Sequence, residues 1–196
     1  KKIIYKNKFI YTKIKRKKLS SILIKNSFRF ITTNIQCKKK FLRINKHNPN
    51  CFLAKKSDLK DIADIAEKSY KYSRFHLDKN IPNKTCNKIF FSWVKNYFKK
   101  QRGDYLLIYK QNKKTIGFLL LKKEDKSFLR IDLIAVKNKF KGSNIGKKLI
   151  EYAMFLYQKK YSHLVVGYQS QNFSAKIFYK KTGFTILSKR DIYHYY

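Results

Sequence analysis

Residues 128–150 read FLRIDLIAVKNKFKGSNIGKKLI, and they decide the fold. The first nine residues are typical of a strand, and the stretch after Gly146 has the apolar spacing of a helix. Between them lies a short basic loop, KFKGSNIG at 139–146. The first N–H groups of a helix have no partner within the helix and carry the positive end of its dipole. The junction therefore predicts a binding site for an anion such as a diphosphate.

The loop composition supports this prediction. Gly142 and Gly146 let the backbone approach an anion closely, and Asn144 tolerates the left-handed conformation well for a residue with a side chain. Lys139 and Lys141 add positive charge. A plain strand–turn–helix, in which the glycines serve only the turn, fits the same pattern. The loop has neither the GxxxxGK(S/T) of a P-loop nor the GxGxxG of a dinucleotide site.

The sequence on either side predicts an α+β fold, with a mixed, mostly antiparallel twisted sheet and helices on both faces. Strands are predicted at 27–35, 51–54, 105–109, 115–121, 128–136, 163–168 and, as a closing hairpin, 184–187 with 192–196. Helices are predicted after an N-cap at Ser57, through 89–97, through 149–157 and over 172–181. A linker at 45–50 separates a small β-rich N-terminal lobe (1–48) from a main domain (49–196).

The composition excludes several classes of protein. Hydrophobic residues make up 43% of the 196 residues and aromatic ones 16%, so the chain can build a core and is not disordered by composition. Lysines interrupt every apolar run, which argues against a membrane span. Cys37, Cys51 and Cys86 are scattered without metal-ligand spacing. We therefore expect no metal site and a reducing, cytoplasmic location.

The formal net charge of +37 first suggests a nucleic-acid partner. However, only seven of the 48 basic residues are arginines, which base reading favours, and the lysines are spread along the chain. A drift of the overall amino-acid composition explains the spread of lysines. The positive field would still attract anionic ligands, and small phosphate-bearing molecules fit it as well as RNA does. We expect no specific nucleic-acid partner. Residues 1–24 are too basic for a signal peptide, a basic presequence stays open, and the basic run 15–18 disfavours an amphipathic helix there.

Two ordered motifs resemble the GNAT N-acetyltransferase superfamily. The loop at 141–146 resembles its acyl-CoA pyrophosphate loop, written Q/R-x-x-G-x-G/A, and 172–184 resembles its NxxAxxxYxxxGF segment. Residues 52–70 are also similar to the family's first strand and helix, so that the resemblance covers 51–196. Two departures are Lys141 in place of Arg or Gln, and Asn144 in place of Gly. Neither removes the backbone donors of the loop.

The resemblance implies that acetyl-CoA is the co-substrate and lies between the strands at 128–136 and 163–168. Backbone groups of the first strand would pair with its pantetheine arm, and the loop amides would hold its diphosphate. The implied cofactor-binding residues are Ile134, Ala135, Val136, Lys141, Gly142, Ser143, Asn144, Ile145, Gly146, Lys147 and Asn172.

The resemblance also implies two catalytic residues. Tyr179 matches the family's proton donor to the departing thiolate, because a phenol with an ordinary pKa of ~10 stays protonated at neutral pH. A packed aromatic is the alternative. Asp132 is a candidate base acting through water, and a salt-bridged residue is the alternative. Glu67 and His76 are weaker candidates for the base, and His163 and His194 are expected to be ordinary strand residues.

The segment Ser73-Arg74-Phe75-His76-Leu77-Asp78, followed by Trp93 and Asn96, resembles dTDP-fucosamine acetyltransferases, which acetylate dTDP-4-amino-4,6-dideoxygalactose. The resemblance implies an amino-sugar nucleotide of cell-envelope glycan synthesis as acceptor. Arg74 would bind its phosphates, and His76 and Asp78 its sugar hydroxyls. Alternatively, Arg74 and Asp78 only pin the loop.

Other functions stay open at this point. The acceptor amine could belong to a protein N-terminus, a polyamine or another small molecule. A basic RNA-associated protein on a degenerate GNAT scaffold is a third interpretation. A homodimer is compatible with the sequence.

Overall fold

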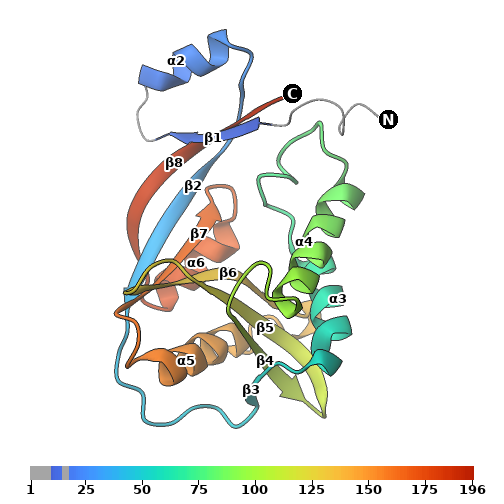
Figure 1. Ribbon diagram of the computed structural model, residues 1–196, viewed down its shortest axis with the longest axis vertical. Helices are drawn as coiled ribbons and strands as arrows, with labels where there is room; N and C mark the ends of the chain where they lie inside the picture. The colour runs from blue at the N-terminus through green and yellow to red at the C-terminus, as the bar shows by residue number, and fades with distance from the viewer. Residues whose placement is uncertain (1–9, 15–17) are drawn as a thin grey trace. The chain divides into compact units, whose positions relative to one another are not determined.

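The computed structural model describes residues 10–14 and 18–196 (Figure 1). Its strands are β1 (Ile10–Ile14), β2 (Arg29–Lys40), β3 (Cys51–Leu53), β4 (Tyr105–Gln111), β5 (Lys114–Lys123), β6 (Phe128–Val136), β7 (His163–Gln169) and β8 (Thr185–Tyr195). Its α-helices are α2 (Lys18–Lys25), α3 (Leu59–Ser69), α4 (Asn83–Phe98), α5 (Ile145–Tyr157) and α6 (Phe173–Lys181). Short 3₁₀ turns cover Lys56–Asp58 and Asn138–Phe140.

The chain forms two compact units that interleave along the sequence. The first unit contains the residues up to Cys37, residues 72–81 and residues 167–196, and the second contains 38–71 and 82–166. The strands β2 and β7 each continue from one unit into the other. The predicted division into 1–48 and 49–196 stays a prediction.

The second unit is built on a mixed sheet in the order β7-β6-β5-β4-β3. Antiparallel pairs join β3 to β4, β4 to β5 and β5 to β6. The pair β6–β7 is parallel, from Phe128 opposite His163 to Ile131 opposite Val166. This confirms the α+β class and the mixed, mostly antiparallel sheet.

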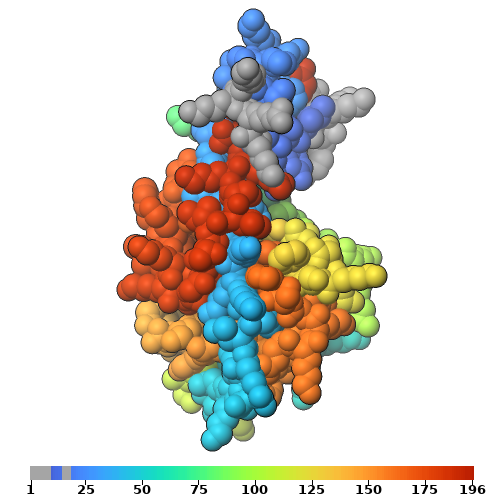
Figure 2. Space-filling view, turned by 90° about the vertical axis from the view of Figure 1, so that its left-hand side faces the viewer, coloured from blue at the N-terminus to red at the C-terminus, as the bar shows by residue number. Residues whose placement is uncertain are grey.

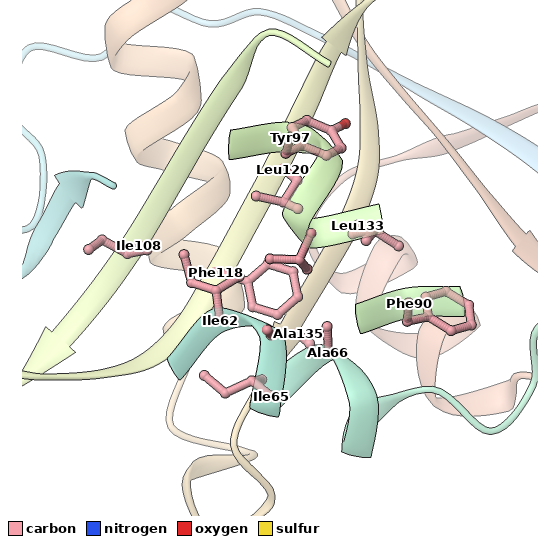
Figure 3. Packing of buried hydrophobic residues seen from close by; sticks show 12 residues of the cluster. Ile62, Ile65, Ala66, Phe90, Tyr97, Ile108, Phe118, Leu120, Leu133 and Ala135 are labelled. Atoms are coloured by element: carbon pink, nitrogen blue, oxygen red, sulfur yellow. The ribbon is translucent and has the colours of Figure 1, made fainter. Parts of the chain in front are cut away.

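Helices cover both faces of this sheet. On one face α3 and α4 pack against alternate residues of β5 and β6, among them Phe118, Leu120 and Leu133 (Figure 3). Because successive strand residues point to opposite faces, Gly117 faces the other side, where α5 packs. The apolar spacing in α3, α4 and α5 thus does what the sequence predicted: it buries one stripe of each helix.

In the first unit β1 runs antiparallel to β8, from Ile10 opposite Tyr195 to Ile14 opposite Asp191. On its other side β8 neighbours β2. The core of this unit includes Ile31, Tyr179 and Tyr193.

Three local predictions were wrong. The expected hairpin at 184–187 and 192–196 is one continuous strand, β8, which lies between β1 and β2 in the sheet. Asp191 in its polar middle accepts a hydrogen bond from Thr33 Oγ1 of β2 at 2.7 Å. The N-cap of α3 is Asp58, since Ser57 already lies in a 3₁₀ turn. Within the N-terminal 24 residues, where no amphipathic helix was expected, α2 begins at the end of the basic run; residues 15–17 of that run lie outside the described residues.

The strand at 128–136 is confirmed, and residues 45–50 lie outside helices and strands. Their role as a linker between two domains stays a prediction. In the described ranges, 10–14 and 18–196, no helix combines the length and the apolar character needed to cross a bilayer.

Candidate active site

The loop between β6 and α5 has the conformation that an anion site needs. Gly142 has φ +86° and Asn144 lies in the left-handed region at φ 59° and ψ 11°, which confirms the prediction for Asn144. The first backbone bond of α5 runs from Lys148 N–H to the carbonyl oxygen of Asn144 at 3.0 Å. The side chain of Asn144 makes no capping hydrogen bond. The amides at 145–147 therefore precede the hydrogen-bond ladder of the helix and remain available to a ligand.

The loop is also open to a ligand. A Cβ atom built on Gly142 meets nothing within 4 Å, so the backbone there can be approached closely. Lys139, Lys141 and Lys147 are exposed around it. Their charges and the positive end of the α5 dipole reinforce one another. These residues fit the diphosphate of a coenzyme.

A glycine in β5 fixes the start of α5. A Cβ built on Gly117 comes within 2.9 Å of Ile145 Cγ2 and 3.3 Å of Val136 Cγ2. Ile145 is buried and is the first residue of α5. Because no side chain intervenes, α5 approaches the sheet closely where the loop leaves β6. A glycine inside a strand indicates such an approach, and this signal was present in the sequence.

The end of β6 contains the residues expected beside the pantetheine arm. Ile134 and Val136 are half-buried, whereas Ala135 is packed in the core below α3 and α4. The hydroxyl of Tyr70 donates to the carbonyl oxygen of Ile134 at 3.1 Å. Sequence reasoning missed this contact, which anchors the strand beside the loop.

Asp132 lies at a β-bulge. Leu120 of β5 faces Leu133 and Leu121 faces Ile131, so Asp132 has no partner on β5. A bulge redirects the side chain of the extra residue. At the bulge, Asp132 is therefore exempt from the regular alternation of β6 side chains between the two faces of the sheet.

The carboxylate of Asp132 is held by two side chains. Nε and Nη2 of Arg102 donate to it at 2.8 and 3.2 Å, and the hydroxyl of Tyr97 donates to Oδ2 at 3.0 Å. The guanidinium carbon of Arg102 also lies 3.5 Å from the ring centroid of Trp93. These contacts match the salt-bridge alternative for Asp132. Its role as the base stays a prediction.

Tyr97 is buried, and burial followed by the charge of Asp132 raises the pKa of its phenol. The phenol therefore keeps its proton and donates to the carboxylate. Gly103 lies directly against the Tyr97 ring, and a Cβ there would come within 2.2 Å of Cε1. Because Gly103 has no side chain, the backbone that follows Arg102 can pass close to the Tyr97 ring.

In the first unit Tyr179 lies in an aromatic cluster. Its ring stacks on Tyr168 at a centroid distance of 5.8 Å and meets Phe178 and Phe184 edge-on. Burial, with a smaller effect of Cys37, raises the pKa of Tyr179. The ring packs as the structural alternative expected, and the phenol remains protonated as a proton donor requires.

Asn172 is the N-cap of α6. Its Oδ1 accepts hydrogen bonds from the Ala175 N–H at 3.0 Å and from Ser174 Oγ at 2.9 Å. An N-cap asparagine satisfies a first-turn donor, which explains this position in the motif. Its Nδ2 group is the part of the side chain left for a ligand contact.

The loop at 72–81 is anchored through Asp78, which is buried. Its Oδ2 lies 2.5 Å from Nδ1 of His194 and accepts a hydrogen bond from the hydroxyl of Tyr196, while Oδ1 accepts from the Asn80 N–H at 3.0 Å. His194 is also buried. The contacts match the loop-pinning alternative for Asp78, and they give His194 a partner that the sequence did not reveal.

The other two predicted acceptor residues are also engaged locally. The guanidinium carbon of Arg74 lies 3.6 Å from the ring centroid of Tyr11 and 4.6 Å from that of Phe75. His76 Nδ1 lies 2.7 Å from Ser73 Oγ. Substrate roles for Arg74, His76 and Asp78 stay predictions.

The comparison with family models decides the class of this site. Residues 102–186 match the model described as "Acetyltransferase (GNAT) domain". Residues 102–186 are therefore similar to a GNAT acetyltransferase domain. The match covers β6, the anion-site loop, α5 and the motif around Tyr179, so the loop and the NxxAxxxYxxxGF segment lie in the part of the chain that the family describes.

One curated relative is similar in sequence to the chain. The spore coat polysaccharide biosynthesis protein SpsD of Bacillus subtilis (strain 168) is 30% identical over 143 residues, which cover 71% of this chain and 47% of SpsD. The chain therefore spans about half the length of the curated relative that it matches.

Solved structures share the fold. A conserved protein of unknown function from Staphylococcus epidermidis has a TM-score of 0.70 at 11% identity, over 98% of this chain and 74% of its own. A GCN5-related N-acetyltransferase from Sphaerobacter thermophilus has a TM-score of 0.65 at 8% identity, over 95% and 59%. PaiA N-acetyltransferase from Thermoplasma acidophilum, solved with coenzyme A, has a TM-score of 0.53 at 19% identity, over 74% and 96%. At these identities the likeness concerns the fold.

The predicted site residues fall into two groups. Asp132, Ile134–Val136 and Lys141–Lys147 belong to the second unit. Arg74, His76, Asp78, Asn172 and Tyr179 belong to the first. Sequence reasoning missed the residues that hold these groups in place, which are Tyr70, Tyr97, Arg102, Gly117, His194 and Tyr196.

Proposed function

We propose that the protein is an acetyl-CoA-dependent N-acetyltransferase whose acceptor is the amino group of a nucleotide-activated amino sugar. The single observation that carries the reaction type is the β6–α5 junction, with Asn144 left-handed, no side-chain cap and an open Gly142. A site of this geometry suits a diphosphate. The GNAT match over residues 102–186 supports coenzyme A as the molecule that carries this diphosphate.

Acetyl-CoA supplies an acetyl thioester. The amides at 142–147 would hold its diphosphate, and Lys141 would add a charge beside it. Backbone groups of Ile134, Ala135 and Val136 and the side chain of Asn172 would orient the arm that carries the thioester. Close positioning of this kind contributes a large part of the rate of a two-substrate reaction.

The acceptor nitrogen would form a bond to the acetyl carbon as the carbon–sulfur bond breaks. We propose that Tyr179 gives its phenolic proton to the departing sulfur, because a phenol is protonated at neutral pH. Burial raises the pKa of Tyr179, which makes this proton harder to release. The proton of the acceptor amine must go to a base. Asp132 is the predicted base, and its carboxylate forms an ion pair with Arg102.

Three observations support the choice of acceptor. The SRFHLD segment at 73–78 carries the resemblance to sugar-nucleotide acetyltransferases, and SpsD, the matched relative, is named for polysaccharide biosynthesis. A chain with a net charge of +37 also attracts an acceptor that carries phosphates.

A thiol-release assay tests the proposal. Acetyl-CoA is offered with dTDP-4-amino-4,6-dideoxygalactose, with its 4-hydroxy counterpart as the matched control, and with peptides and spermidine. We expect CoA release with the amino sugar and none with the hydroxy sugar. Turnover of only peptides or spermidine would retain the transferase and reject the acceptor. Absence of turnover with every amine, together with binding of RNA, would favour the RNA-associated interpretation.

A further inference from the structure

The helix α2 is a well-formed element with a defined end. The N–H of Phe28 donates to the carbonyl oxygen of Leu23 at 2.9 Å, and that of Ser27 to Ile24 at 3.0 Å. Ser27 has φ 63°. These two bonds around a left-handed residue make a Schellman motif, which ends a helix and satisfies its last carbonyls. The chain therefore specifies α2 locally.

The apolar side chains of α2 are not covered. Leu19, Ile22 and Ile24 are 44%, 55% and 59% exposed, and no residue from 19 to 25 is buried. Leu19 and Ile22 are three positions apart and share one face of the helix. In Figure 2 the blue side chains of α2 form part of the surface at the top of the view. Exposed aliphatic side chains grouped on one element mark an interaction surface.

The charge around this helix is almost all positive. Five of the six residues at 13–18 are Lys or Arg, and Lys25 follows at the other end of α2. The three segments of the first unit contain 11, 2 and 5 lysines and arginines, and their acidic residues are Asp78 and Asp191. Asp78 is buried and Asp191 accepts a hydrogen bond from Thr33. An approaching partner therefore meets a field of one sign.

The combination of charge and side-chain type selects the partner. A second copy of this chain would bring the same positive charge and be repelled. The phosphates of a nucleic acid would also be attracted by the lysines, but its bases stack on aromatic side chains, whereas α2 offers leucine and isoleucine. An anionic lipid surface matches both features, because lysines and arginines attract its headgroups and aliphatic side chains enter the acyl boundary.

We propose that α2 binds the surface of an anionic lipid bilayer, with Leu19 and Ile22 inserted among the lipids. This association is peripheral and separate from the acetyl transfer proposed above. It would place the protein beside acceptors or products that are handled at a membrane.

Vesicle co-sedimentation of the full chain tests the proposal. The protein is mixed with vesicles of phosphatidylcholine alone and of phosphatidylcholine with phosphatidylglycerol, at about 0.05 M and about 0.5 M salt, since salt screens charges over a Debye length. We expect binding to the anionic vesicles only, weakened at the higher salt. The double variant Leu19→Ser/Ile22→Ser should bind about tenfold or more weakly, because partition depends on buried apolar area.

The matched control is Phe52→Ser/Leu53→Ser on β3, where the side chains are 43% and 55% exposed in the other unit. It should bind as the unmodified protein does, and circular dichroism checks that both double variants are folded. Equal binding to neutral vesicles, no binding to anionic vesicles, or unchanged binding of the Leu19→Ser/Ile22→Ser variant would overturn the proposal. A dimer in light scattering that this variant dissociates would also overturn it, because the face would then serve self-association.

Discussion

Asp132 and Arg102 form a two-point ion pair, with Nε of Arg102 2.8 Å from Oδ2 of Asp132 and Nη2 3.2 Å from Oδ1. The pair lies between the β-bulge of β6 and the segment after α4. It therefore links the strand expected beside the acyl arm to the helix that covers it. The carboxylate is mostly buried, with 11% of its side chain exposed.

Breaking this pair should destabilise the protein. Arg102→Met leaves the Asp132 carboxylate facing only Tyr97, and we expect a loss of about 1–3 kcal/mol in the free energy of unfolding, measured by urea denaturation. Asp132→Asn should cost a similar amount. If Asp132 has only a structural role, the folded Asp132→Asn variant should keep kcat within about fivefold of the unmodified protein. A fall of about 100-fold or more in kcat at unchanged CoA affinity would establish Asp132 as the base.

Removing the Tyr179 hydroxyl should affect catalysis and not binding. The ring of Tyr179→Phe keeps its contacts with Tyr168 and Phe184, so the fold and the CoA affinity should be unchanged. We expect kcat to fall about 100-fold or more because the thiolate loses its proton donor. The comparison is steady-state kinetics beside a CoA titration. Full activity in this variant would remove Tyr179 from the mechanism.

A side chain at position 117 should displace the cofactor loop. The Cβ of Gly117→Ala would lie 2.9 Å from Ile145 Cγ2, so the side chain of Ile145, the first residue of α5, must give way. We expect CoA to bind several-fold more weakly and the protein to lose about 1–3 kcal/mol of stability. Gly117→Ala/Ile145→Val, which removes a methyl group from the facing side chain, should recover part of both losses. Unaltered CoA affinity in Gly117→Ala would show that α5 is not positioned by this contact.

Acid should destabilise the first unit through His194. Burial lowers the pKa of His194, Asp78 opposes this effect in part, and Arg74 adds to it. The unfolded chain then binds a proton that the folded chain does not, so stability is retained above the ordinary pKa of ~6.5 and is lost as the pH falls below it. The melting temperature should therefore drop between about pH 7 and about pH 5.

His194→Asn tests this assignment, because its amide can still donate to Asp78 and does not titrate in this range. The acid-induced drop in melting temperature should be smaller in this variant. An NMR titration of the His194 ring in the unmodified protein gives an independent check. A ring pKa at or above 6.5 would contradict the prediction.

Much of the fold could be predicted because local patterns and tertiary packing agree. The strand at 128–136 and the left-handed Asn144 both follow from residue chemistry that acts within a few positions. The continuous β8 could not be predicted, since its polar middle is held by Thr33, 158 positions away in the sequence. The helix α2 was missed because its apolar face does not contribute to a core.

The sequence allowed the anion-site loop to be predicted, but not the residues that hold the other site residues in place. Loop amides at a strand–helix junction have a recognisable pattern. The partners of Asp132 and Asp78, by contrast, come from positions 97, 102, 194 and 196, and nothing in the local sequence of either aspartate indicates them. Gly117 is the exception, because a glycine inside an apolar strand indicates a close neighbour.

Isothermal titration calorimetry with coenzyme A is the most direct measurement of the central inference, that the β6–α5 junction holds the diphosphate of the cofactor. We expect one site per chain, competition by inorganic pyrophosphate, and weaker binding in Asn144→Val, whose side chain disfavours the left-handed conformation by about 1–2 kcal/mol. Asn144→Gly should bind as the unmodified protein does. No heat of binding, or equal affinity in Asn144→Val, would contradict the account.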